Sequence, residues 1–161
     1  MSDTQTHSKD ESTDNTSAQK PIPRWILKLM TRINVVVYKA SNGRLMNSLA
    51  GMPIIMVGMT GAKSGQPRTI PLMYVPDGDN FLLVASQGGA PKNPVWYNNL
   101  VKYPEVDITF QGKTIAMRAT VLSEEEKAAV WPICVEYYPP YADYQKLTTR
   151  SIPVFRCTPI A

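Results

Sequence analysis

The chain contains few of the side chains on which hydrolases and metalloenzymes depend. Its two cysteines, Cys134 and Cys157, are too few for a metal cage. Its only histidine is His7, which lies in a polar N-terminal stretch and cannot belong to a Ser-His-Asp or Cys-His pair in the core. These shortages exclude hydrolase chemistry of that kind, and we expect no metal site.

A secretory signal peptide is also missing, which argues against a secreted protein held together by disulfides. We therefore expect a cytoplasmic protein. The sequence has no long stripe of lysine and arginine, no zinc-ligand spacing and no recognition-helix signature. Nucleic acid is accordingly not an expected partner.

The composition suits one folded domain behind a polar tail. A length of 161 residues and an apolar fraction of 43% are sufficient for one packed core. Residues 1–20 hold four acids and two lysines among Ser, Thr, Asn and Gln, which predicts a disordered tail. The net charge is +4 and the tail accounts for −2, so +6 remains for the rest of the chain. This excess favours an anionic ligand or surface.

Residues 21–40 are predicted to contain an amphipathic helix. Apolar residues recur at helical spacing from Trp25 to Val37, and lysine and arginine lie on the opposite side. The segment is too short and too charged to span a bilayer. Two roles stay open: its apolar face packs against the core, or it lies in an anionic membrane surface, which would make the protein peripheral on the inner face of the cell membrane.

The remaining residues, 41–161, are predicted to form strands joined by tight turns, with helices inserted between them. Pro71 places its strand at a sheet edge or bulge, and Asn93 followed by Pro94 predicts the N-cap and first residue of a helix. This pattern favours a mostly antiparallel α+β fold, a small β-barrel with about six strands and three or four helices. The predicted strands span residues 53–59, 69–75, 81–86, 106–111, 114–121 and 152–157, and two of the predicted helices span 95–103 and 123–138.

Residues 60–68 read TGAKSGQPR and are the most informative part of the chain. The glycines permit a tight turn that brings backbone N–H groups close to an oxyanion, while Lys63, Ser64 and Arg68 add a hydroxyl and two cations. A nucleotide P-loop is excluded, because Ala62 replaces the required glycine before the lysine and the following prolines prevent a helix. The segment is therefore an anion-binding hairpin that suits phosphate, or an ordinary basic turn.

A second glycine loop, residues 87–92, precedes the helix that is predicted to begin near Pro94. If the two glycine loops converge, they form one concave pocket, and the N-terminus of the helix adds N–H groups that also suit an anion. Trp96 and Asn99 lie one helical turn apart and can face inward together. Taken alone, Trp96 is more simply explained as a core anchor.

Tyrosines are unusually dense around Pro139 and Pro140, where the sequence places Tyr137, Tyr138, Tyr141 and Tyr144. A tyrosine offers an apolar face for stacking and a hydroxyl that donates a hydrogen bond or a proton, so this group suits the wall of a flat-ligand site. Such a group is also a common packing feature at a helix end. Both interpretations stay open.

Three motifs in the same order, TGAKSGQPR at 60–68, ASQGGAPKNPVWYNNL at 85–100 and YPPYADY at 138–144, resemble the deazaflavin-dependent nitroreductase family of actinobacteria. The resemblance extends over about residues 25–159. It implies a split β-barrel of the flavin reductase/pyridoxamine oxidase type that binds coenzyme F420. The reduced coenzyme would deliver a hydride to a small-molecule electron acceptor, namely a quinone, an activated enone or a nitroaromatic compound. Barrels of this kind often pair, so a homodimer is compatible with the resemblance, and the oligomeric state stays open.

The resemblance also implies roles for particular residues. Ser86 and Tyr138 would be catalytic, with Ser86 and the helix of Trp96 orienting the ring and Tyr138 or a water donating a proton. The acceptor would lie against Met73, Tyr138, Tyr141 and Tyr144. The coenzyme would be bound by Lys63, Ser64, Arg68, Pro71, Leu72, Ala85, Ser86, Gln87, Lys92, Trp96 and Asn99.

The chain departs from the family pattern at four positions that are among these contacts or close to them in sequence. Ala62 and Gln87 replace an arginine and a lysine, which removes two cations beside the coenzyme, and Ile70 replaces an asparagine. Met73 replaces a tyrosine in the acceptor wall, which argues against activation of bicyclic nitroimidazole prodrugs. Two alternatives stay open: an FMN-dependent reductase on the same barrel, and a non-catalytic F420 carrier or membrane-associated binding protein.

Overall fold

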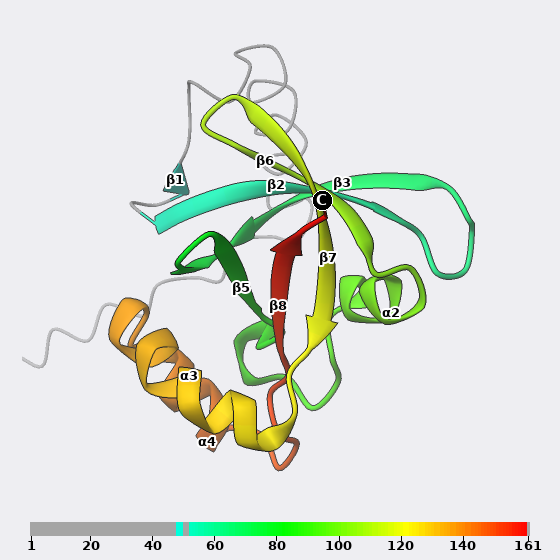
Figure 1. Ribbon diagram of the computed structural model, residues 1–161. Coiled ribbons are helices and arrows are strands. Elements are labelled where there is room, and N and C mark those ends of the chain that lie inside the picture. The colour runs from blue at the N-terminus through cyan, green and yellow to red at the C-terminus, as the bar shows by residue number, and fades with distance from the viewer. Residues whose placement is uncertain (1–47, 50–51, 161) are drawn as a thin grey trace, which may run out of the picture.

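The computed structural model describes residues 48–49 and 52–160, with side chains from residue 53 onward. The predicted tail at 1–20 and amphipathic helix at 21–40 lie outside the described residues. The described strands form one curled antiparallel sheet in the order β1-β2-β6-β7-β8-β5-β4, and β3 pairs with β2 (Figure 1). The strands are β1 Ser48–Leu49, β2 Met52–Thr60, β3 Pro67–Met73, β4 Val75–Asp77, β5 Asn80–Val84, β6 Glu105–Phe110, β7 Lys113–Val121 and β8 Val154–Pro159.

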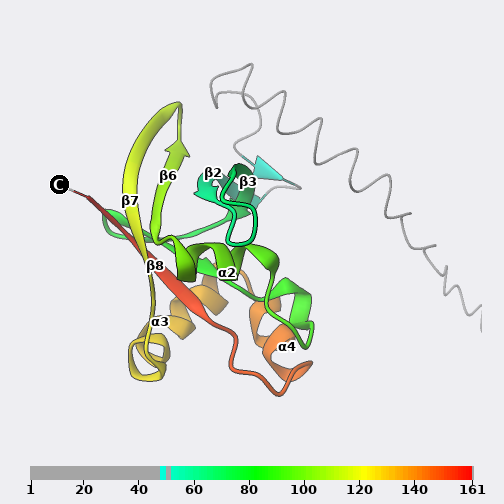
Figure 2. The ribbon, with the colours of Figure 1, turned by 90° about the vertical axis from the view of Figure 1, so that its right-hand side faces the viewer.

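The helices lie at two different places on the sheet. α3 (Glu124–Tyr137) and α4 (Pro140–Lys146) lie together at one end, whereas α2 (Val95–Lys102) lies against β7 and β2 (Figure 2). A short 3-10 turn, η1 (Gln87–Gly89), leads from β5 towards α2 and contacts α4. The predicted α+β split β-barrel is confirmed, with two short strands, β1 and β4, in addition to the predicted ones.

Two predicted details of the chain path are wrong. Asn93 does not cap α2: the N-cap residue is Pro94, and the Asn93 side chain instead accepts a hydrogen bond from Arg150 at 2.7 Å. The predicted strands 106–111 and 114–121 leave Gly112 and Lys113 for the turn between them, whereas the turn between β6 and β7 is formed by Gln111 and Gly112, with φ of 49° and 79°. The two positive φ values are those that a two-residue hairpin turn requires.

Both faces of strand β5 are buried, which is why its residues are apolar in succession rather than in alternation with polar ones. Phe81 and Leu83 point into a core cluster between the strands, together with Leu100 of α2. Leu82 and Val84 alternate with them and point into a second cluster that α3 and α4 cover. The segment after β5 is the second glycine loop, and its turn η1 contacts α4.

Candidate functional site

The β2–β3 turn has the tight geometry that its glycines predicted. The Gly61 N–H donates to Gln66 O at 2.9 Å, the Gly65 N–H donates to Gly61 O at 2.8 Å, and Gly65 has a φ of 65°. A Cβ atom on Gly61 would lie 2.6 Å from Ser64 Oγ, so only glycine fits there without a shift. The turn holds Lys63 and Ser64 at the surface.

The hairpin is fastened to α2 by polar contacts. The Ala62 N–H donates to Asn99 Oδ1 at 2.8 Å, and Lys102 Nζ donates to Ala62 O at 2.9 Å. Asn99 is only 8% exposed, and its amide nitrogen donates to Met59 Sδ at 3.4 Å. Asn99 thus fixes the position of the turn relative to the helix.

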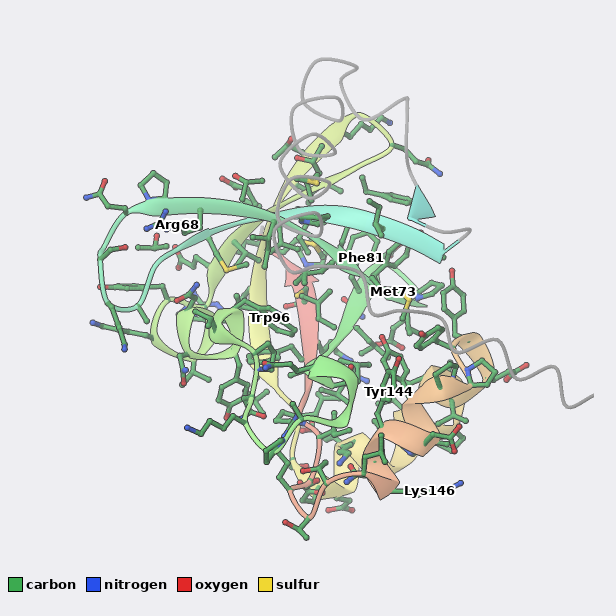
Figure 3. All side chains as sticks on the ribbon, turned by 180° about the vertical axis from the view of Figure 1, so that it is seen from behind. Arg68, Met73, Phe81, Trp96, Tyr144 and Lys146 are labelled. Carbon is green, nitrogen blue, oxygen red and sulfur yellow. The ribbon has the colours of Figure 1, made fainter. Side chains whose placement is uncertain are left out.

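A first pocket of about 400 Å³ lies between this hairpin and α2. Lys63, Ser64 and Arg68 line it on the hairpin side, and Trp96 and Asn99 line it on the helix side. Figure 3 labels one residue of each side, Arg68 and Trp96. Lys63 and Arg68 are exposed, and neither forms an ion pair with another of the described residues. Two cations and a glycine turn beside one hollow are suited to an anionic ligand.

A second pocket of about 290 Å³ lies beside the second glycine loop. Trp96 lines this pocket as well as the first. The two glycine loops thus border two hollows that share the Trp96 indole. The centroid of this indole lies 5.7 Å from that of the Phe155 ring. The second pocket is lined by Leu72, Met73, Val84, Ser86, Gln87, Gly88, Pro94, Trp96, Tyr138, Tyr141 and Tyr144.

Three tyrosines form one wall of the second pocket. Tyr138 and Tyr144 place their hydroxyl oxygens 3.3 Å apart, and the Tyr138 and Tyr141 rings meet edge to face at 4.9 Å. The hydrogen bond with Tyr144, with some burial, raises the pKa of Tyr138 above its ordinary value, and burial raises the pKa of Tyr141. Tyr138 and Tyr141 therefore keep their protons at neutral pH. Tyr137 is exposed and is not among the lining residues.

The second glycine loop has an uncommon backbone. Gln87, Gly88 and Gly89 have φ values of 47°, 63° and 77°, three successive residues in the left-handed region. A Cβ atom on Gly89 would lie 2.8 Å from both Tyr144 O and Leu147 Cβ, which explains why α4 packs so closely on this loop.

Arg150 is a residue of the site region that sequence reasoning missed. Its guanidinium donates to Ala90 O, Asn93 Oδ1, Ala85 O and Ser86 O at 2.7–3.1 Å. Burial lowers the pKa of Arg150 from its usual value. No local signal could have identified it, because its partners lie about sixty residues earlier in the chain.

Three predicted coenzyme contacts lie in neither pocket. Pro71 is half-buried in β3, Ala85 has no exposed surface and Lys92 is exposed on the loop. Their roles stay predictions. Among the described residues there is no group of three or more His, Cys, Asp or Glu side chains that could hold a metal ion. Within the same part of the chain, every helix is too short or too polar to cross a membrane.

Residues 29–159 match the family model described as F420H(2)-dependent quinone reductase. The chain belongs to this family. An F420H(2)-dependent quinone reductase of Mycobacterium tuberculosis H37Rv is 37% identical over 141 residues, which cover 83% of this chain and 95% of the relative. The predicted family, its oxidoreductase class and its dependence on coenzyme F420 are thereby confirmed.

Solved structures agree with this family assignment. The F420-H2 dependent reductase FDR-A is 44% identical with a TM-score of 0.61, over 66% of this chain and 94% of that one. A chain described as a domain-swapped dimer is 37% identical with a TM-score of 0.62, over 79% and 99%. The heme storage protein HutZ of Vibrio cholerae is 12% identical with a TM-score of 0.50, over 81% and 91%, and shares the fold alone.

Proposed function

We propose that this protein reduces quinones with reduced coenzyme F420, and that the two pockets bind different reactants. The observation that supports this division is Trp96, which borders a cationic hollow on one side and a phenol-lined hollow on the other. The first hollow suits the anionic part of the coenzyme, and the second suits a flat acceptor. When bound, the coenzyme supplies the hydride.

The residues around the first pocket fit the phosphate and polyglutamate tail of this coenzyme. Lys63 and Arg68 would bind its negative charges, because no described carboxylate already neutralises them. Ser64 adds a hydroxyl beside the close turn at Gly61. Ala62 supplies no cation here, so affinity depends on these few groups.

The coenzyme ring would lie near the boundary between the pockets. Leu72, Ser86 and Gln87 border the second pocket together with Trp96, and Asn99 borders the first. Pro71 and Lys92 complete the proposed set of contacts, whereas Ala85, which has no exposed surface, is left out of it. The apolar members exclude water from the reacting face, while Ser86 offers a hydroxyl for orientation.

The acceptor would lie against the tyrosines and Met73. Tyr138 is the proposed proton donor, alone or through a water, because its phenol is protonated and its hydrogen bond to Tyr144 orients it. Reduction of a quinone to a hydroquinone requires a hydride and one proton, and the phenolate is then reprotonated from solvent. Activated enones and nitroaromatic compounds are further proposed acceptors of the same pocket.

Two measurements test the proposal. Purified protein is titrated with oxidised F420 and, separately, with FMN, while fluorescence is followed. Binding of FMN in preference to F420 would favour a flavin enzyme with a nicotinamide donor. Turnover of menadione by reduced F420 is then measured, and a protein that binds F420 without turnover of any quinone, enone or nitroarene would be a carrier.

A homodimer is the proposed assembly. Its support is the relative at 37% identity whose solved structure is described as a domain-swapped dimer. Light scattering coupled to size exclusion would measure the mass in solution, and a monomer at micromolar concentration would contradict the proposal.

Contact with an anionic membrane is proposed for the amphipathic segment at residues 21–40, which lies outside the described residues. It would make a cytoplasmic protein peripheral on the inner face of the membrane. Co-sedimentation with anionic liposomes, before and after deletion of residues 1–39, measures it. Equal pelleting of both forms would exclude this role.

A further inference from the structure

The guanidinium of Arg150 forms four hydrogen bonds with residues 85–93, the segment that contains the second glycine loop. Nη2 donates to Ala85 O at 3.1 Å and to Ser86 O at 2.8 Å, and Nε donates to Ala90 O at 2.9 Å. Nη1 donates to Asn93 Oδ1 at 2.7 Å. One side chain thus bonds both ends of a nine-residue stretch, from β5 to the start of α2.

The second glycine loop has few backbone hydrogen bonds of its own, so contacts from other residues are needed to hold its conformation. Within it, the Gly89 N–H donates to Ser86 O at 3.0 Å, and the Ala90 N–H donates to Gln87 O at 3.2 Å. Gln87 adopts a φ of 47°, which a residue with a Cβ atom rarely occupies. Conformations of this kind persist only where surrounding contacts hold them.

The backbone next to the Arg150 side chain is in turn held by hydrogen bonds from α4. Gln145 Nε2 donates to Arg150 O at 2.8 Å, and the Ile152 N–H donates to Gln145 Oε1 at 2.9 Å. One amide of α4 therefore fixes the backbone directly after Arg150, on both sides of Ser151. Because α4 also contributes Tyr144 to the second pocket, the same helix positions the tyrosine wall and the arginine that holds the opposite loop.

We propose that Arg150 is a positioning residue for the reductase reaction, which fixes Ser86 and the start of α2 against the tyrosine wall. Arg150 does not line either pocket and is not proposed to contact coenzyme or acceptor. A lysine cannot replace it, because one ammonium has three donors on a single atom, whereas the four acceptors here are spread around a planar fork. This inference rests on the proposed function only for its effect on turnover.

The test compares Arg150→Lys with Arg156→Lys. Arg156 is a matched control because it is also half-buried and bonded through its guanidinium, to Asp77 at 2.7 Å, but it does not contact the loop. Amide hydrogen exchange over residues 85–93 should be faster in Arg150→Lys and unchanged in Arg156→Lys. Exchange at the β2–β3 hairpin should be unaffected in both.

Turnover gives the second readout. For Arg150→Lys, kcat with menadione should fall about tenfold or more, and F420 affinity should fall less, because the hairpin that is proposed to bind the anionic part of the coenzyme keeps its contacts. For Arg150→Ala, guanidinium at low millimolar concentration should restore part of kcat. A salt without guanidinium, at the same ionic strength, should not restore kcat.

Unchanged exchange at residues 85–93 in Arg150→Lys would overturn the inference. So would a kcat equal to that of Arg156→Lys. If the wild-type protein itself reduces no acceptor, the proposed function is wrong, and the exchange comparison still decides whether Arg150 holds the loop.

Discussion

Replacing Gly89 with alanine should destabilise the fold by two separable effects. The residue has a φ of 77°, a conformation that costs an L residue about 1–2 kcal/mol. The new Cβ atom would also lie 2.8 Å from Tyr144 O and from Leu147 Cβ, so α4 would have to move. Overpacking of this kind typically costs about 1–3 kcal/mol. We therefore expect the free energy of unfolding to fall by about 2–5 kcal/mol.

Gly88 provides the control within the same loop. Its φ is 63°, close to that of Gly89, but a Cβ atom there would meet no atom within 4 Å. Gly88→Ala should therefore cost only the backbone contribution, about 1–2 kcal/mol. Urea unfolding followed by circular dichroism measures both variants, and the difference between them isolates the contact with α4.

A second readout follows from the position of Tyr144. If α4 moves rather than unfolds in Gly89→Ala, the tyrosine wall moves with it, and the KM for menadione should rise more than in Gly88→Ala. Equal unfolding free energies for the two variants would refute the reasoning, because the contact between Gly89 and α4 would then contribute nothing.

The remaining predictions concern the proposed ligand contacts. Lys63→Ala and Arg68→Ala should each weaken F420 binding by about 1–3 kcal/mol, and unchanged affinity in both would argue against the hairpin as the anion site. Tyr138→Phe should lower kcat more than coenzyme affinity, and an equal loss of both would indicate a structural ring. Because the pKa of Tyr138 is raised, wild-type turnover should decline only as the pH rises above the ordinary tyrosine range, and this decline should be absent from Tyr138→Phe. Asn99→Leu should expose the hairpin amides to faster hydrogen exchange, since the Ala62 N–H loses its acceptor, and unchanged exchange would show that this bond does not hold the turn.

Local signals predicted those features that depend on neighbours in sequence. The glycines of the hairpin, the apolar run of β2 and the one-turn spacing of Trp96 and Asn99 each impose a geometry within a few residues, and the structure has that geometry. The start of the helix predicted from residue 123 is a further example, because Ser123 and Glu126 form a capping box with hydrogen bonds in both directions.

Features that depend on distant partners were not predictable in the same way. Asn93 has the residue type of a helix cap, but its side-chain oxygen accepts a hydrogen bond from the Arg150 guanidinium and does not cap α2. Local pattern does not predict α4, because two successive prolines are typical of a helix end, whereas Pro140 is compatible with the first position of a new helix. The separation into two pockets depends on where one indole packs against Phe155, which no local pattern specifies.

The shared indole has a consequence for how this enzyme can change. If the two hollows hold the coenzyme and the acceptor as proposed, a substitution at Trp96 would change the surroundings of both reactants at once, and selectivity for the electron donor and for the oxidant could not be adjusted independently at that position. Under the same proposal, acceptor range would be more readily varied at Met73 or along the tyrosines, which border only the second hollow.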